Sequence, residues 1–102
     1  MGMQEMMRQA QQMQKKIAEM QSELKDKTVE ASSGGGMVTV KATGSQEIRE
    51  ISIDPTVVDP EEMEMLQDLI LTATNEALKK AKEMMENEMS KITGGLKIPG
   101  IV

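Results

Sequence analysis

The side chains that most often perform covalent chemistry are missing from this chain. Its 102 residues include no His, Cys or Tyr, so the commonest general bases and nucleophiles are absent. The adjacent carboxylates of Glu61 and Glu62 follow Asp59-Pro60, where acids stabilise the positive end of a helix dipole. We therefore expect a protein that is not an enzyme and that needs no metal and no cofactor.

Three consecutive glycines, residues 34–36, could cradle a phosphate with their backbone amides. The lysine and the Ser or Thr that complete a P-loop do not follow them. Because β-branched residues come next, the glycines are better explained as the tip of a β-hairpin.

The basic run near residue 80 could contact phosphates, but its acidic neighbours favour a different interpretation. Each lysine has a glutamate one helical turn away, and such i,i+4 pairs are typical of a solvent-exposed helix face. The expected pairs are Glu76–Lys80, Lys79–Glu83 and Lys82–Glu86.

The bases near the N-terminus are the stronger candidates for phosphate contact. Among the first eighteen residues, Arg8, Lys15 and Lys16 face a single acid, Glu5, whereas residues 47–68 hold eight acids and one base. At about 100° per residue, Arg8 and Lys15 lie opposite the apolar stripe of their helix. The net charge of −5 argues against a uniformly basic nucleic-acid binder, so the distribution of charge matters more than its sum.

These bases are positioned by a helix that we predict over about residues 4–26. Its apolar residues recur at steps of three and four, which is an a/d heptad pattern and more typical of a helix–helix core than of a promiscuous Met-rich binding surface. The helix would be roughly 35 Å long, so part of it should project beyond a small sheet. The stripe consists of Met3, Met6, Ala10, Met13, Ile17, Met20 and Leu24.

Three short strands are predicted over residues 28–32, 37–43 and 46–53, because β-branched runs alternate with Gly and Pro turn signals. Ile51 and Ile53 share one face of the last strand, but Ile48 is out of phase with them. This indicates either a β-bulge or contact of Ile48 with a second apolar surface, such as a partner chain.

A second helix should begin at Asp59 as N-cap, with Pro60 at its first position and Glu62 completing a capping box. It should run to about Ile92, where Gly94-Gly95 stops it, and contact both the sheet and another helix. The order of elements predicts an α+β fold: a helix, a three-stranded antiparallel meander and a long helix. We expect one domain over residues 1–93 and an apolar Gly/Pro tail over residues 94–102.

The composition favours assembly of more than one chain. There are twelve Met and no aromatic residues, so the packing should be adaptable, and a second chain should complete the core. No apolar run approaches the length of a membrane span, and no signal-peptide pattern is present, so a cytoplasmic location is expected.

Four segments taken together resemble the YbaB/EbfC family of bacterial nucleoid-associated proteins: GGGMVTVKATG, IREISIDP, EMLQDLILTATNEALKKAKE and GGLKIPGI. The resemblance covers nearly the whole chain. It implies a homodimer joined through the sheets, with projecting helical arms that bind duplex DNA with little sequence preference in the nucleoid and affect its organisation and gene expression. The implied DNA-binding residues are Arg8, Lys15, Lys16, Lys91 and Lys97. The residues expected at the dimer interface are Val38, Val40, Ile48 and Ile51.

The predicted partners are therefore double-stranded DNA and a second copy of the chain, with no membrane and no small-molecule substrate. Because no aromatic side chain is available to stack on bases, contacts of Lys and Arg with the phosphate backbone remain. The alternative is a protein–protein adaptor that captures a partner helix with the Met stripe and the apolar tail.

Overall fold

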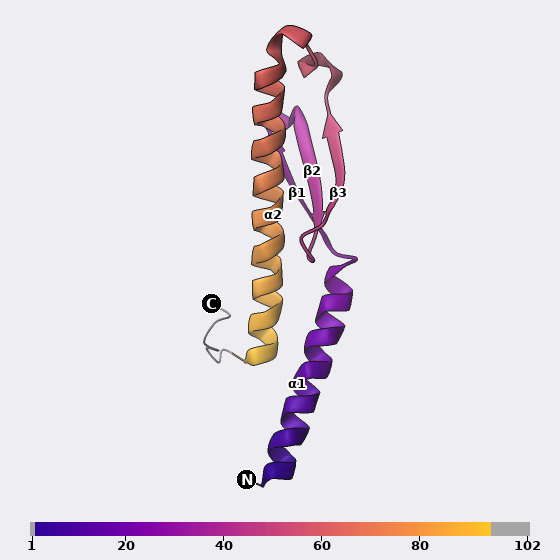
Figure 1. Cartoon of the computed structure of the whole chain (residues 1–102), viewed down its shortest axis with the longest axis vertical. Coiled ribbons are helices and arrows are strands. Elements are labelled where there is room, and N and C mark those ends of the chain that lie inside the picture. Colours follow the sequence, from indigo (N-terminus) through magenta and orange to yellow (C-terminus); the bar gives the residue numbers. More distant parts are fainter. Residues whose placement is uncertain (1, 95–102) are drawn as a thin grey trace.

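The structure is a computed structural model of the whole chain, and it describes residues 2–94. Figure 1 shows a long helix packed beside a three-stranded sheet, with a second helix extending away from the sheet. The elements are α1 (Met3–Leu24), β1 (Thr28–Ser33), a 3-10 turn (Gly34–Gly36), β2 (Val38–Thr43), β3 (Ile48–Ile53), two further 3-10 turns (Pro55–Val57 and Pro60–Glu62) and α2 (Met63–Thr93). The strands are antiparallel in the order β1-β2-β3, so the predicted α+β fold is confirmed.

The core lies between α2 and the inner face of the sheet, where α2 covers β1 and β2 (Figure 1). Ala73, Ala77 and Ala81 follow one another at i,i+4 spacing and have no exposed surface. Because alanine has a short side chain, the helix approaches the strands closely, and the facing residues Val38 and Val40 are also fully buried. The helix-facing residues of the outermost strand β3 remain partly exposed.

A β-bulge explains the phase of Ile48. Val40 pairs with Ile51 and Lys41 with Glu50, but the next residue of β2 pairs with Ile48, so Arg49 is an extra residue in β3. The bulge returns Ile48 to the helix-facing side, where it packs against the buried core. Of the two explanations offered by the sequence, the bulge is confirmed.

Helix α1 projects past the end of α2, as its predicted length required (Figure 1). The molecule is accordingly elongated, with extents of 69 × 23 × 16 Å. The apolar stripe of α1 is covered only toward its C-terminal end: Met20 and Leu24 are buried, whereas Met3 and Met6 are 80% and 60% exposed. The heptad pattern therefore predicted a helix–helix contact with α2 that the structure forms over half its length.

The predicted boundaries of the second helix are confirmed in part. The carboxylate of Asp59 accepts a hydrogen bond from the amide of Glu61 at 3.0 Å, but this cap opens a 3-10 turn, and the α-helix begins at Met63. The capping-box bond from the side chain of Glu62 is not formed in the described chain; its amide donates to the carbonyl of Asp59 at 2.9 Å. At the other end, Gly94 caps α2 in the left-handed conformation with φ of 62°. Among residues 2–94, neither helix is long and apolar enough to cross a membrane.

Candidate nucleic-acid interface

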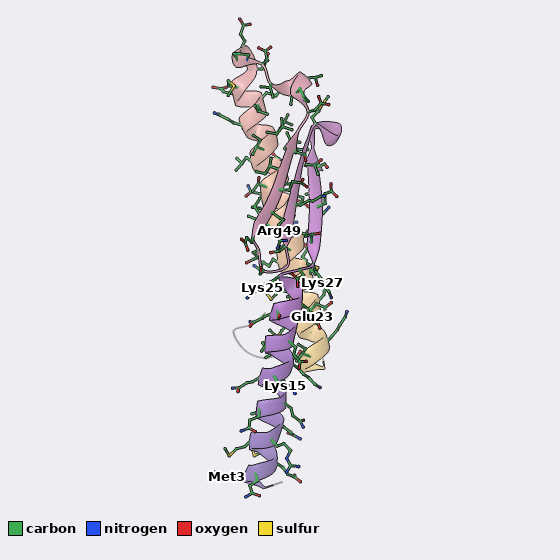
Figure 2. The ribbon with its side chains drawn as sticks, turned by 90° about the vertical axis from the view of Figure 1, so that its right-hand side faces the viewer. Met3, Lys15, Glu23, Lys25, Lys27 and Arg49 are labelled. Atoms are coloured by element: carbon green, nitrogen blue, oxygen red, sulfur yellow. The ribbon has the colours of Figure 1, made fainter. Side chains whose placement is uncertain are left out.

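Arg8, Lys15 and Lys16 lie on the part of α1 that carries few contacts with the rest of the chain. We call residues 3–16 the α1 arm. All three side chains are exposed, and within the described chain none has a carboxylate within 4.0 Å. Figure 2 views the side of α1 that faces away from α2 and shows Lys15 midway along the helix. Their positive charges are therefore available to a ligand.

The spacing of these bases fits a repeating anion. Arg8 and Lys15 are seven residues apart, so at 1.5 Å per residue they are separated by about 10 Å along the helix axis. This is about the rise of three base pairs, each of which adds a phosphate to each strand. The side chains of Gln4, Gln11 and Gln12 are exposed on the same or bordering faces, and amides can also donate to phosphate oxygens.

Lys91 lies where α2 ends beside α1, and it is partly neutralised. Its ammonium group is 3.2 Å from the carboxylate of Glu88, which also lies 4.0 Å from Lys27. Lys16 and Lys91 together line a shallow hollow of about 250 Å³ between the two helices. Because glutamates line the same hollow, Lys91 is the weaker phosphate ligand. Lys97, the remaining predicted DNA-binding residue, lies outside the described residues.

The basic run on α2 does not form the ion pairs that its spacing predicts. Over residues 2–94, no i,i+4 pair between its lysines and the neighbouring glutamates lies within 4.0 Å. The prediction is wrong because exposed side chains gain little from such pairs and are free to extend elsewhere. Lys80 instead donates to the backbone carbonyl of Glu30 at 2.9 Å, which ties α2 to the outer strand β1.

Comparison with known proteins decides the family. The profile of the YbaB/EbfC DNA-binding family matches residues 1–96. The chain belongs to this family. It is 63% identical to a "Nucleoid-associated protein" of Acetivibrio thermocellus over 97 residues, which are 94% of this chain and 86% of the relative. It is 54% identical to a "Nucleoid-associated protein" of Alkaliphilus metalliredigens, covering 98% of this chain and 88% of the relative.

A solved structure supports the same assignment. The chain resembles an uncharacterized protein, HP0035, from Helicobacter pylori with a TM-score of 0.82 and 26% sequence identity. The match covers 92% of this chain and 99% of that one. YbaB/EbfC proteins are a DNA-binding and non-enzymatic class, in agreement with the expectation drawn from the missing catalytic side chains.

This YbaB/EbfC chain also has basic residues that the sequence analysis missed. Lys25, Lys27 and Arg49 gather where α1 meets the sheet (Figure 2). Arg49 belongs to a stretch whose acids dominate the charge count, and only the fold brings it to the end of α1. The phase of Ile48 was the signal that could have located it, because a bulge next to Ile48 re-aims the following side chain.

The residues predicted at the dimer interface of this family member separate into two groups. Val38 and Val40 have no exposed surface, so they belong to the core beneath α2 and cannot contact a second copy directly. Ile48 is half-buried, and Ile51 is 46% exposed on the same face of the sheet as Val40. The surface that could pair is therefore the uncovered side of β3.

The one carboxyl group with a resolved pKa shift among the described residues lies away from the arm. The backbone amide of Thr56, and then its hydroxyl, donate to Asp54 and hold the pKa of this carboxyl below its ordinary value of 3.8. These bonds shape the turn that follows β3 and do not involve the arm bases.

Proposed function

We propose that this YbaB/EbfC chain is a nucleoid-associated protein of the bacterial cytoplasm that binds double-stranded DNA through the α1 arms of a homodimer. Arg8, Lys15 and Lys16 would contact phosphates, with Lys91 and Lys97 in a lesser role. The observation that carries the proposal is the exposure of three unneutralised bases on a projecting helix in a member of a DNA-binding family. Relatives at 54–63% identity carry the name nucleoid-associated protein.

Binding with little sequence preference follows from the chemistry of the arm. Lys and Arg contacts with phosphate oxygens hold a protein on the duplex but do not read its sequence. The chain has no aromatic side chain that could stack on an unpaired base, so duplex is favoured over single strands. Such contacts suit a role in nucleoid organisation, with gene expression affected as a consequence.

A second copy would cover the apolar side of β3. Ile51 and Ile53 face the α2 side of the sheet, beyond the strands that α2 covers, and they are 46% and 37% exposed. Exposed apolar residues at the same end of the molecule extend this surface, and contiguous apolar patches of this kind mark interaction sites. They are Met37, Val58, Met63 and Met65. Ile48 and Ile51 remain in the proposed interface, whereas Val38 and Val40 support it from the core.

Replacing Arg8, Lys15 and Lys16 together by Gln tests the site. With about three to five phosphate contacts per pair of arms, the logarithm of the wild-type affinity should fall with the logarithm of salt concentration at a slope of roughly −3 to −5. The variant should bind all duplexes more weakly and with a shallower slope, without loss of the dimer. A fluorescence-anisotropy titration at several salt concentrations measures both quantities.

The control replaces Lys79, Lys80 and Lys82 by Gln, which removes the same charge from α2. It should weaken binding less than the arm variant and leave the slope closer to the wild-type value. If the arm variant binds as tightly as the wild type, the assignment of the site to α1 is wrong.

An adaptor function is the second candidate, and the exposed methionines of the α1 arm favour it. Met3, Met6 and Met7 are each at least 60% exposed, and methionine adapts to varied apolar partners. Affinity capture from a lysate with and without nuclease separates the two functions. An adaptor keeps its partners after nucleic acid is destroyed, whereas partners bridged by DNA are lost.

A further inference from the structure

The turn between β2 and β3 holds the C-terminal end of α1. The backbone amide of Gly44 donates to the carbonyl of Leu24 and to that of Lys27, in both cases at 2.9 Å. The last carbonyls of a helix have no partners within the helix, so this amide satisfies one that would otherwise be free. The sheet is thus bonded directly to the end of the helix that carries the arm bases.

Gly44 also makes room for this contact. A Cβ atom at position 44 would lie 2.6 Å from Cδ2 and 2.9 Å from Cβ of Leu24, and 2.9 Å from Cε of Met84. Leu24 is only 2% exposed, so it has little freedom to move aside. The φ angle of Gly44 lies outside the left-handed region, so glycine is required here for space and not for its backbone conformation.

Arg49 adds a second bond to the same helix end. It is the extra residue of the β3 bulge, and its guanidinium group donates to the carbonyl of Lys25 at 2.9 Å. A positive side chain is favourable near the negative C-terminal end of a helix dipole. Figure 2 shows Arg49 and Lys25 together where the helix meets the sheet. The bulge therefore directs a base of β3 to the root of the arm.

We propose that Leu24, Gly44 and Arg49 form an elbow that fixes the direction of the α1 arm, and that Gly44 and Arg49 are positioning residues for DNA binding. This inference rests on the proposed function. Arg8 lies sixteen residues before Leu24, which is about 24 Å of helix, so a rotation of about 10° at the elbow would displace it by about 4 Å. That displacement is enough to break a contact between a base and a phosphate.

A looser elbow should weaken binding in a recognisable way. If the arm holds the binding orientation for only a fraction of the time, the apparent affinity falls by that fraction. The contacts made in the bound state are unchanged, so the salt slope stays the same. Loss of a phosphate contact, by contrast, makes the slope shallower by about 0.9.

The Gly44→Ala variant tests the elbow without changing any charge. Because the chain has no Cys, cysteines replacing the exposed residues Gln12 and Asn75 can carry spin labels on α1 and α2. Labelled protein diluted into unlabelled protein reports the distance within one chain. We expect the distance distribution to shift or broaden, and the affinity for duplex DNA to fall about 5- to 10-fold with an unchanged salt slope.

The Arg49→Met variant keeps the proposal testable if the Gly44→Ala variant does not fold, because Arg49 is an exposed side chain. Its control is Lys79→Met, which removes the same charge from an exposed position on α2. We expect Arg49→Met to bind about 3-fold more weakly than the control with the same salt slope. A slope shallower than that of the control by about 0.9 would make Arg49 a phosphate ligand and overturn its positioning role.

The possible failures can be told apart. A folded Gly44→Ala variant with an unchanged distance distribution, or with wild-type affinity, would overturn the elbow and leave the DNA-binding function intact. Wild-type protein that does not bind duplex at all would overturn the proposed function, and the role of the elbow in it.

Discussion

The sheet body, formed by β1, β2, β3 and α2, differs from the α1 arm in what its side chains touch. In the body, small residues are packed to complete burial, as Val40 and Ala77 show. In the arm, Met3 and Met6 are exposed on one face, and the bases extend from another. The body is specified by packing, whereas the arm has few internal contacts that restrict its side chains. Arm residues can therefore serve a ligand at little cost in stability.

The proposed interface should show the largest effect. The Ile51→Asp substitution places a charge in the centre of the uncovered apolar surface, where a residue of this kind is expected to contribute roughly 2–4 kcal/mol to association. Analytical ultracentrifugation should show dissociation into single chains, and DNA affinity should fall because two arms are no longer joined. The control, Ser52→Asp, adds the same charge on the other face of β3 and should leave more dimer. A fully dimeric Ile51→Asp variant would place the interface elsewhere.

The same substitution placed in each region compares them directly. Ala77→Leu forces a larger side chain between α2 and the sheet and should reduce the free energy of unfolding by about 1–3 kcal/mol. Ala10→Leu lies on the exposed arm and should change it by no more than about 0.5 kcal/mol. Urea unfolding at one protein concentration measures both. Equal losses would mean that the arm is packed as tightly as the body.

The end of α2 should respond more weakly. Gly94 has φ of 62°, a conformation that costs a residue with a Cβ atom about 1–2 kcal/mol. Gly94→Ala should therefore lower the free energy of unfolding by about 1 kcal/mol. Asn87→Ala, at an exposed position in the same helix, should have a smaller effect or stabilise the protein. A larger loss in the Asn87 variant would contradict the assignment of Gly94 as the helix cap.

The smallest effect is expected from acid. Bonds from Thr56 lower the pKa of Asp54 in the folded protein, so the ionised carboxylate stabilises the fold above the ordinary pKa of 3.8. That contribution is lost as the pH falls through the lowered pKa. The Asp54→Asn variant should therefore lose slightly less stability than the wild type between about pH 5 and pH 2. Identical pH profiles would show that the Thr56 bonds do not matter for stability.

The sequence predicted the elements of the body well because their signals are local. Heptad spacing located α1, glycine and proline bounded the strands, and Gly94 marked the end of α2. The start of α2 was displaced because Asp59 caps a 3-10 turn instead of the α-helix itself. The burial of Val38 and Val40 was misassigned to an interface because alternation identifies an apolar face but not what covers it.

The arm bases could be predicted from local charge, but the elbow could not. Leu24, Gly44 and Arg49 lie in three separate parts of the chain, and each has an ordinary role when viewed alone. Only the register of β3 and the antiparallel turn bring them to the end of α1. Long-range bonds of this kind leave no periodic signal in a single sequence.

The most direct test measures the affinity of wild-type protein for two duplexes of unrelated sequence across a range of salt concentrations. If the arms bind phosphates, both duplexes should give similar affinities, and the logarithm of affinity should fall with the logarithm of salt concentration at a slope of roughly −3 to −5. An affinity that does not change with salt, or a strong preference for one duplex, would contradict binding through the backbone.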